Sequence, residues 1–241
     1  DLRLFLSQWA SAFHLNDNGR QSIQFFDHHG DALLKVYATT QTDMAAWETL
    51  IAEHRVAAPA PLALRPLEPV KYADTADGAA LENDWRAMTD VHQFFGLLRK
   101  YQLSRQQAFR LVSDDLACRV DRHALPSLLE TVRQEGNEIM IFVGNRGCVQ
   151  IFTGALEKLA PMRGWLNIFN TTFTLHLREE SLDEVWVTRK PTSDGHVTSV
   201  ELFAKDGTQI AQLYGQRSEG HPEQTQWRQQ VDRLTREGQP A

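Results

Sequence analysis

The sequence is poor in cysteine and contains no long hydrophobic segment. Its two cysteines, Cys118 and Cys148, form neither a CxxC nor a CxxCH pattern. This argues against a disulfide scaffold, a zinc ribbon and covalent attachment of a prosthetic group. No apolar run reaches the roughly 18 residues that a transmembrane helix needs, so we expect no membrane insertion. A cytoplasmic location fits both observations.

Common enzyme fingerprints are also missing from the sequence. It has no P-loop, no Rossmann glycine pattern, no GxSxG and no HExxH. The net charge of -6 does not suggest a protein that binds nucleic acid or anionic membranes, although a local basic patch is not excluded. What the chain does have is 42% hydrophobic residues over 241 positions, which is enough for a substantial core.

Proline divides the chain into two parts. Four of the nine prolines fall within residues 57–80, which we interpret as a linker: Pro59, Pro61, Pro66 and Pro69. Residues 1–56 are predicted to contain a β-hairpin over 22–37 and a helix over 42–51. Because the chain starts at Asp1 with a strand-like pattern, we expect these residues to be the end of an incomplete N-terminal half. Residues 81–241 are expected to form a C-terminal half.

The C-terminal half begins with helical patterns and continues with strands. We expect one helix over Glu82–Tyr101, a second after the capping pair Ser104 and Gln107, and a third from Pro126 to Gly136. Predicted strands then follow at 138–143, 149–152, 173–177, 185–189, 197–203 and 210–214, before a polar C-terminal helix. Short strands joined by tight turns predict an α+β fold, with helices beside a large antiparallel sheet.

An internal repeat supports a duplicated architecture. Residues 22–37 (SIQFFDHHGDALLKVY) align without gaps on residues 199–214 (SVELFAKDGTQIAQLY), with identical Ser, Phe, Gly and Tyr positions. Each copy is followed by a polar loop and a helix that carries Trp47 or Trp227. We therefore expect two related halves.

His92 is the first candidate for chemistry. In the predicted helix, counting by three and four puts Trp85, Met88, His92 and Phe95 on one face. A histidine among large apolar side chains suits a haem pocket, because the porphyrin needs apolar walls and the iron needs one neutral imidazole nitrogen. The commoner use of such a residue is a half-buried histidine bonded to a backbone carbonyl, and the residues alone favour that interpretation.

A haem also carries two propionates, which require cationic or hydroxyl partners at the rim of the pocket. Candidates lie at the predicted start of a helix or ends of strands: Arg105, Lys190, Tyr214 and Arg217. The alternative for each is an ordinary solvated surface group.

Several segments of the chain resemble the bacterial hemin-degrading factor family, the HemS/ChuS/HmuS type. They are DLRLFLSQWA (1–10), WRAMTDVHQFF (85–95), GNRGCVQIFTG (144–154), WLNIFN (165–170), EVWVTRKPTSDGHVTS (184–199) and IAQLYGQRSEG (210–220). The resemblance implies two repeated halves, each a large antiparallel sheet with flanking helices, and haem held in a cleft of the C-terminal half. It also implies a cytoplasmic haem-uptake protein that opens the porphyrin oxidatively and releases iron.

The resemblance assigns roles to individual residues. It implies that His92 is the proximal ligand of the iron in haem b, and that Arg3 and Phe5 line the distal side. It implies a propionate-side group of Arg105, Lys190, Gln212, Tyr214 and Arg217. Two departures concern the first half: the N-terminal segment of the family is absent, and the connection over residues 16–20 is short. Both put any second haem site in that half in doubt.

A mechanism follows from that assignment. His92 would bind the iron on one side, and Arg3 would act on the opposite side, where O2 binds. Electrons would come from an external donor, because no flavin or nicotinamide motif is visible.

The implied partners are an inner-membrane haem importer and a reductase, and the formation of a homodimer is left open. The rival hypothesis is a haem chaperone or storage protein without physiological turnover. A third is a scaffold that mainly binds proteins.

Overall fold

The computed structural model describes the backbone of residues 1–237 and side chains up to residue 236, and the chain forms two compact units. The first unit contains Asp1 and residues 70–143 and 151–241, and the second contains residues 2–69 and 144–150. Residues 55–77 form neither helix nor strand, as the prolines predict. None of the described helices is long and apolar enough to cross a membrane.

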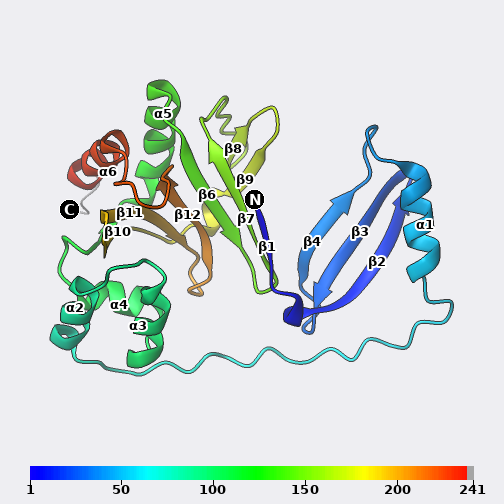
Figure 1. Cartoon of the computed structure of the whole chain (residues 1–241), viewed down its shortest axis with the longest axis horizontal. Helices are drawn as coiled ribbons and strands as arrows, with labels where there is room; N and C mark the ends of the chain where they lie inside the picture. The colour runs from blue at the N-terminus through cyan, green and yellow to red at the C-terminus, as the bar shows by residue number, and fades with distance from the viewer. Residues whose placement is uncertain (238–241) are drawn as a thin grey trace. The chain divides into compact units, whose positions relative to one another are not determined.

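The first unit is built on a sheet whose strands lie in the order β7-β6-β12-β11-β10-β5 (Figure 1). Pairing is antiparallel from β6 through β12, β11 and β10 to β5. The strands are β5 (Ala117–Val120), β6 (Ile139–Gly144), β7 (Cys148–Gly154), β10 (Glu184–Thr192), β11 (Gly195–Phe203) and β12 (Gln209–Gly215). A large antiparallel sheet with helices confirms the predicted α+β class.

The sheet separates two hydrophobic cores because alternate residues of each strand point to opposite faces. On one face, Val187, Val200 and Leu213 pack with α5 (Leu125–Glu135), α6 (Thr225–Glu237) and the hairpin of β8 (Trp165–Phe169) and β9 (Thr174–Arg178). On the other face, Trp186 and Phe203 pack with α2 (Gly78–Arg86), α3 (Gln93–Tyr101) and α4 (Arg105–Leu111). The candidate residues of β10–β12 share this second face.

Local signals explain where several helices begin and end. Ser104 and Gln107 form the predicted capping box of α4. Pro126 lies in the first turn of α5, and Gly136 ends that helix with φ of 73°, a conformation that glycine adopts without strain. Helix α2 begins at Gly78, inside the range 57–80 that we interpret as a linker, because Asp77 caps it through the Ala80 N–H. Short 3₁₀ turns occur at Arg122–Ala124 and Glu179–Ser181.

The predicted single helix over Glu82–Tyr101 is wrong. The structure has two helices, α2 and α3, separated by a turn over residues 87–92. The turn forms because polar side chains take the backbone donors that a continuous helix would use. The Gln93 amide oxygen accepts from the Thr89 N–H at 2.9 Å, and the Asp90 carboxylate accepts from the His92 N–H at 2.7 Å.

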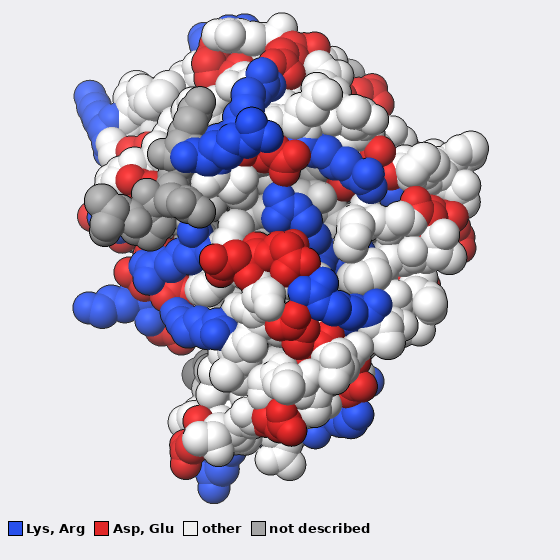
Figure 2. All heavy atoms as spheres, turned by 90° about the vertical axis from the view of Figure 1, so that its left-hand side faces the viewer, with Lys and Arg blue, Asp and Glu red and all other residues white. Residues whose placement is uncertain are grey.

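Acidic and basic side chains are interspersed on the face of the molecule drawn in Figure 2. In the first unit, several exposed acidic and basic side chains form ion pairs. The Arg86 guanidinium, for example, lies 2.6 Å from Glu82 and 2.9 Å from Asp115. Such exposed pairs contribute little to stability individually.

The second unit contains a three-stranded antiparallel sheet, β2 (Trp9–Asp17), β3 (Arg20–Asp27) and β4 (Ala32–Tyr37), followed by α1 (Met44–His54). Strand β1 (Leu2–Leu4) pairs with the first residues of β7, and a 3₁₀ turn at Leu6–Gln8 joins it to β2. Arg146 forms ion pairs with Asp27, at 2.9 Å, and with Asp31.

The two copies of the sequence repeat pair their strands in the same register. Ser22 pairs with Tyr37 as Ser199 pairs with Tyr214, and both hairpins change register at the phenylalanine near the turn. The indole N–H of Trp47 donates to the Gln21 side chain, and that of Trp227 donates to the Thr198 carbonyl, one residue before each serine. The two copies therefore share their strand pairing and the anchoring of the helix that follows.

Candidate functional site

His92 is an exposed side chain at the start of α3, where it occupies the N-cap position. Its ring Nδ1 lies 2.8 Å from Asp90 Oδ1, and its side chain is 75% exposed. An ionised carboxylate only accepts hydrogen bonds, so Nδ1 carries the proton in this contact. Nε2 then holds the lone pair, and no hydrogen bond to it occurs among the described residues. Histidines that bind metals through Nε2 commonly have Nδ1 held by a carboxylate in this way.

The predicted common face of Trp85, Met88, His92 and Phe95 does not exist, because the helix is broken between them. Trp85 and Met88 are buried, whereas Phe95 is 57% exposed. Phe95 is three residues after His92 on α3, so these two exposed rings share one side of that helix. Phe95 is therefore the exposed apolar residue nearest to His92 along α3, whereas Trp85 is part of the hydrophobic core.

The turn that carries His92 is attached to the β10–β11 hairpin. The Ser193 N–H donates to the Thr89 carbonyl at 3.0 Å, and the Arg217 guanidinium lies 3.4 Å from the Asp194 carboxylate. Hydrogen bonds from the His92 backbone and ring lower the pKa of Asp90, and the charge of Arg217 lowers it further. Arg217 thus belongs to the surroundings of His92.

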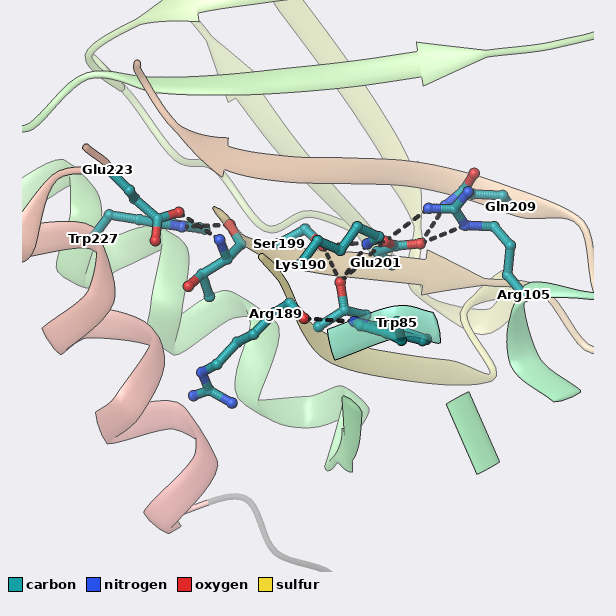
Figure 3. Close-up of polar contacts among 11 residues, drawn as sticks. Trp85, Arg105, Arg189, Lys190, Ser199, Glu201, Gln209, Glu223 and Trp227 are labelled. Carbon is teal, nitrogen blue, oxygen red and sulfur yellow. Dashed lines mark hydrogen bonds and ion pairs between the residues drawn. The ribbon is translucent and has the colours of Figure 1, made fainter. Parts of the chain in front are cut away.

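A second group of charges is buried on the sheet face beneath α3 and α4. Glu201 of β11 is fully buried and lies between two cations. Arg105 reaches it with two nitrogens, at 2.8 and 3.0 Å, and Lys190 Nζ reaches it at 2.9 Å (Figure 3). Lys190 also donates to Thr188 at 2.6 Å, and Gln209 donates to Glu201 at 2.9 Å. The group carries two positive charges and one negative charge.

Burial and the neighbouring charges have opposite effects on the pKa values of Glu201 and Lys190. Burial alone would raise the pKa of Glu201, but Arg105 and Lys190 outweigh it and hold that pKa far below its ordinary value. Burial lowers the pKa of the Lys190 ammonium to about 8, against the attraction of Glu201. Glu201 is therefore ionised at neutral pH, and Lys190 is the cation that loses its proton most easily.

Aromatic rings connect the two groups. The Arg105 guanidinium lies 4.9 Å from the centre of the Phe94 ring and 5.9 Å from that of the exposed Phe95. Lys190 Nζ lies 4.8 Å from the Phe94 ring. Phe95 therefore lies between His92, three residues before it along the chain, and the Arg105 guanidinium at the start of α4.

Tyr214 and Gln212 lie on β12 beside this charge group. Gln212 is the register partner of Glu201, and Tyr214 is the partner of Ser199. Burial, followed by the charge of Glu201, raises the pKa of the Tyr214 hydroxyl, which stays protonated and can donate. Its ring contacts Phe142 edge to face, with centres 5.2 Å apart.

The structure therefore groups the predicted rim residues into two sets. Arg105 and Lys190 contact Glu201, and Gln212 and Tyr214 lie on the neighbouring strand, whereas Arg217 pairs with Asp194 of the hairpin that is bonded to the turn of His92. Arg3 lies on β1 and Phe5 just after it, both in the second unit. Phe5 is 46% exposed, and its backbone N–H donates to the Gly147 carbonyl.

Sequence analysis missed two residues of the site, Asp90 and Glu201. A signal existed for Glu201, which stands among apolar residues of a predicted central strand. A carboxylate in that position requires buried cationic partners. In the other copy of the repeat the equivalent residue is the neutral Gln24. For Asp90 the signal in the sequence was its position two residues before His92, from which an aspartate can accept a hydrogen bond from the histidine backbone.

Comparison with known proteins shows the family. The profile described as "Haemin-degrading HemS.ChuX domain" matches residues 1–54 and 102–234. The chain is 62% identical to the hemin transport protein HmuS of Yersinia pestis over 239 residues, covering 97% of this chain and 69% of that protein. The chain belongs to the haemin-degrading HemS/ChuX-domain family. His92 lies outside the residues that this profile matches.

Solved structures show the same fold. The heme degrading enzyme ChuS of Escherichia coli O157:H7 matches with a TM-score of 0.92 and 66% identity, over 97% of this chain and 70% of that one. Another structure describes ChuS as an E. coli heme oxygenase. Apo-PhuS, a heme-binding protein from Pseudomonas aeruginosa, matches with a TM-score of 0.93 and 40% identity, over the same shares.

Proposed function

We propose that this chain binds haem through His92 and degrades it oxidatively as part of bacterial haem uptake. The observation that carries the proposal is the exposed His92 ring, whose Nδ1 is held by Asp90 so that Nε2 can bind iron. The relatives support the ligand and the reaction, since they are hemin transport proteins and a heme oxygenase. Haem is the substrate as well as the ligand.

The residues of the first unit fit the chemistry of a porphyrin. Phe95 offers an exposed apolar ring beside the imidazole, which suits the porphyrin plane. Arg105 and Lys190 exceed the charge of Glu201 by one, so the buried group can accept a propionate. Tyr214, Gln212 and Arg217 add hydrogen-bond donors for the propionates. Arg3 and Phe5, which belong to the second unit, are further residues that we propose for haem binding.

The reaction requires O2 and electrons. Bound haem supplies the oxygen chemistry, and His92 fixes the position of the iron. Arg3 would supply guanidinium donors to the negative charge that develops as O2 reacts. Electrons would come from an external donor, with a reductase as the partner that supplies them. We place the protein in the cytoplasm, where an inner-membrane importer would hand over haem to it. It would act there either as a monomer or as a homodimer.

Turnover separates this function from that of a haem chaperone or storage protein, which the heme-binding relative PhuS makes the second candidate. The purified hemin complex is mixed with ascorbate and oxygen in the presence of catalase, which removes free peroxide. We expect the Soret band to disappear and an open tetrapyrrole and iron to be released. A complex that keeps its haem intact under these conditions would favour the chaperone.

Replacing Arg3 with alanine should separate binding from turnover. We expect Arg3→Ala to keep hemin bound but to degrade it roughly a hundredfold more slowly, the size of effect that loss of one electrostatic donor has in other active sites. The measurement is the rate of Soret loss under the same conditions. The matched control is Arg20→Ala, an exposed arginine stacked on Tyr37 in the same unit. Equal rates for Arg3→Ala and the wild type would remove Arg3 from catalysis.

The proposal also predicts a pH dependence of hemin affinity. Below its pKa of about 8, the Lys190 ammonium is already protonated in the free protein, so ligand binding there requires no uptake of a proton. Above that pH, binding of an anionic propionate must first take up a proton, so affinity should fall by up to about tenfold per pH unit. Hemin titrations between roughly pH 7 and pH 10 measure this.

Two variants at the same position provide the controls. Lys190→Gln should bind less tightly and lose the decline above about pH 8, because it has no proton to release. Lys190→Arg should keep its charge and its affinity through the same range. The same decline in Lys190→Gln as in the wild type would assign the titration to another group.

A further inference from the structure

The Asp90 carboxylate makes two contacts with His92 through the same oxygen. Oδ1 accepts from the backbone N–H at 2.7 Å and lies 2.8 Å from ring Nδ1. The first contact closes an Asx turn before α3, in which an aspartate accepts from the backbone N–H two residues on. The second is not needed for that turn, because an Asx turn requires no bond to a side-chain ring. It orients the imidazole and decides which nitrogen is protonated.

The position of the pair makes this contact sensitive to ligand. Asp90 and His92 have exposed side chains, at 59% and 75%. A planar apolar ligand bound at Nε2 would cover the imidazole and exclude water from it. Hydrogen bonds to an ionised group become stronger when water is excluded. The carboxylate would then increase the basicity of the ring toward a bound metal ion.

We propose that Asp90 tunes the haem iron through His92 by giving the axial imidazole anionic character that favours the ferric over the ferrous state. This inference rests on the proposed function. Asp90 does not touch the ligand, so it is a positioning residue. Its consequence is a low reduction potential, which makes delivery of the first electron dependent on a donor of matching strength.

Asp90→Asn tests this proposal because the amide oxygen can still accept from the backbone N–H while the charge is lost. We expect the preference for ferric over ferrous hemin to fall about tenfold, which raises the midpoint potential by about 59 mV for one electron. We also expect the iron–histidine stretching band in the resonance Raman spectrum of the ferrous complex to move to lower frequency. Asp90→Glu, which restores the charge, should recover part of both shifts.

The control is Asp115→Asn, which removes the same charge from an exposed residue that pairs with Arg86. It should leave both the potential and the stretching band unchanged. If Asp90→Asn also leaves both unchanged, Asp90 only stabilises the turn before α3 and the proposal is overturned. If the wild type shows no iron–histidine band, the proposed ligand itself is wrong. Circular dichroism of each variant confirms that the fold is retained.

Discussion

Replacing His92 with alanine is expected to weaken hemin binding by at least about a hundredfold, or about 2.7 kcal/mol. Within the part of the chain described, His92 is the exposed histidine whose Nδ1 is held by a carboxylate, and the exposed Phe95 follows it by three residues. Alanine removes the bond to iron but leaves the propionate-binding residues in place. We therefore expect residual binding with a shifted and weakened Soret band in a hemin titration.

His123→Ala is the matched control for this variant. His123 is also exposed and lies in a short turn of the same unit, next to α5. Its removal should change neither the affinity nor the spectrum. Adding imidazole to His92→Ala should restore part of the wild-type spectrum, since the free base can occupy the vacated position. Wild-type affinity and spectrum in His92→Ala would refute the ligand assignment.

Replacing Glu201 with glutamine is expected to lower the free energy of unfolding by about 3–5 kcal/mol. The substitution keeps the shape but leaves Arg105 and Lys190 buried without their counter-charge. The hemin affinity should not fall with the stability. Without Glu201, Lys190 loses the attraction that raises its pKa and releases its proton more readily, so the group keeps a net charge of one, which Arg105 provides. Glu201→Gln should therefore bind the propionates about as tightly as the wild type, and hemin should stabilise both to a similar extent.

Denaturant unfolding of the apo and hemin-bound forms measures both effects. The control is Glu219→Gln, an exposed carboxylate in the same unit, which should change the unfolding free energy by no more than about 0.5 kcal/mol. Adding Lys190→Met to Glu201→Gln should recover part of the stability, because the buried amine that has lost its partner is then removed. If Glu201→Gln loses stability and affinity together, the charge group supports the fold but does not receive the ligand.

Much of the fold could be predicted because local signals agree with the tertiary structure. The hairpins at Gly30 and Gly207 have a glycine with positive φ at the turn and alternating side chains on either side. The capping box at Ser104 and the glycine after α5 marked helix ends for the same reason. Strands β2, β5 and β8 were not predicted. The four residues of β5, with Cys118 and Arg119 inside them, give no clear period on their own.

The site was less predictable because its geometry depends on competition between side chains and backbone. Apolar spacing continues through residues 85–95 although the helix stops, and only the hydrogen bonds of Asp90 and Gln93 show the break. Charge alone suggested that Arg105 and Lys190 were exposed rim residues. The structure shows that both are largely buried and share Glu201, a long-range contact that no local pattern contains.

The most direct test of the account is a crystal structure of the wild-type hemin complex. We predict iron bound to His92 Nε2, with Nδ1 still within hydrogen-bond distance of Asp90 Oδ1. We also predict a propionate within reach of Arg105 or Lys190. Iron bound by another residue, or by Nδ1 after loss of the Asp90 contact, would contradict the central claim.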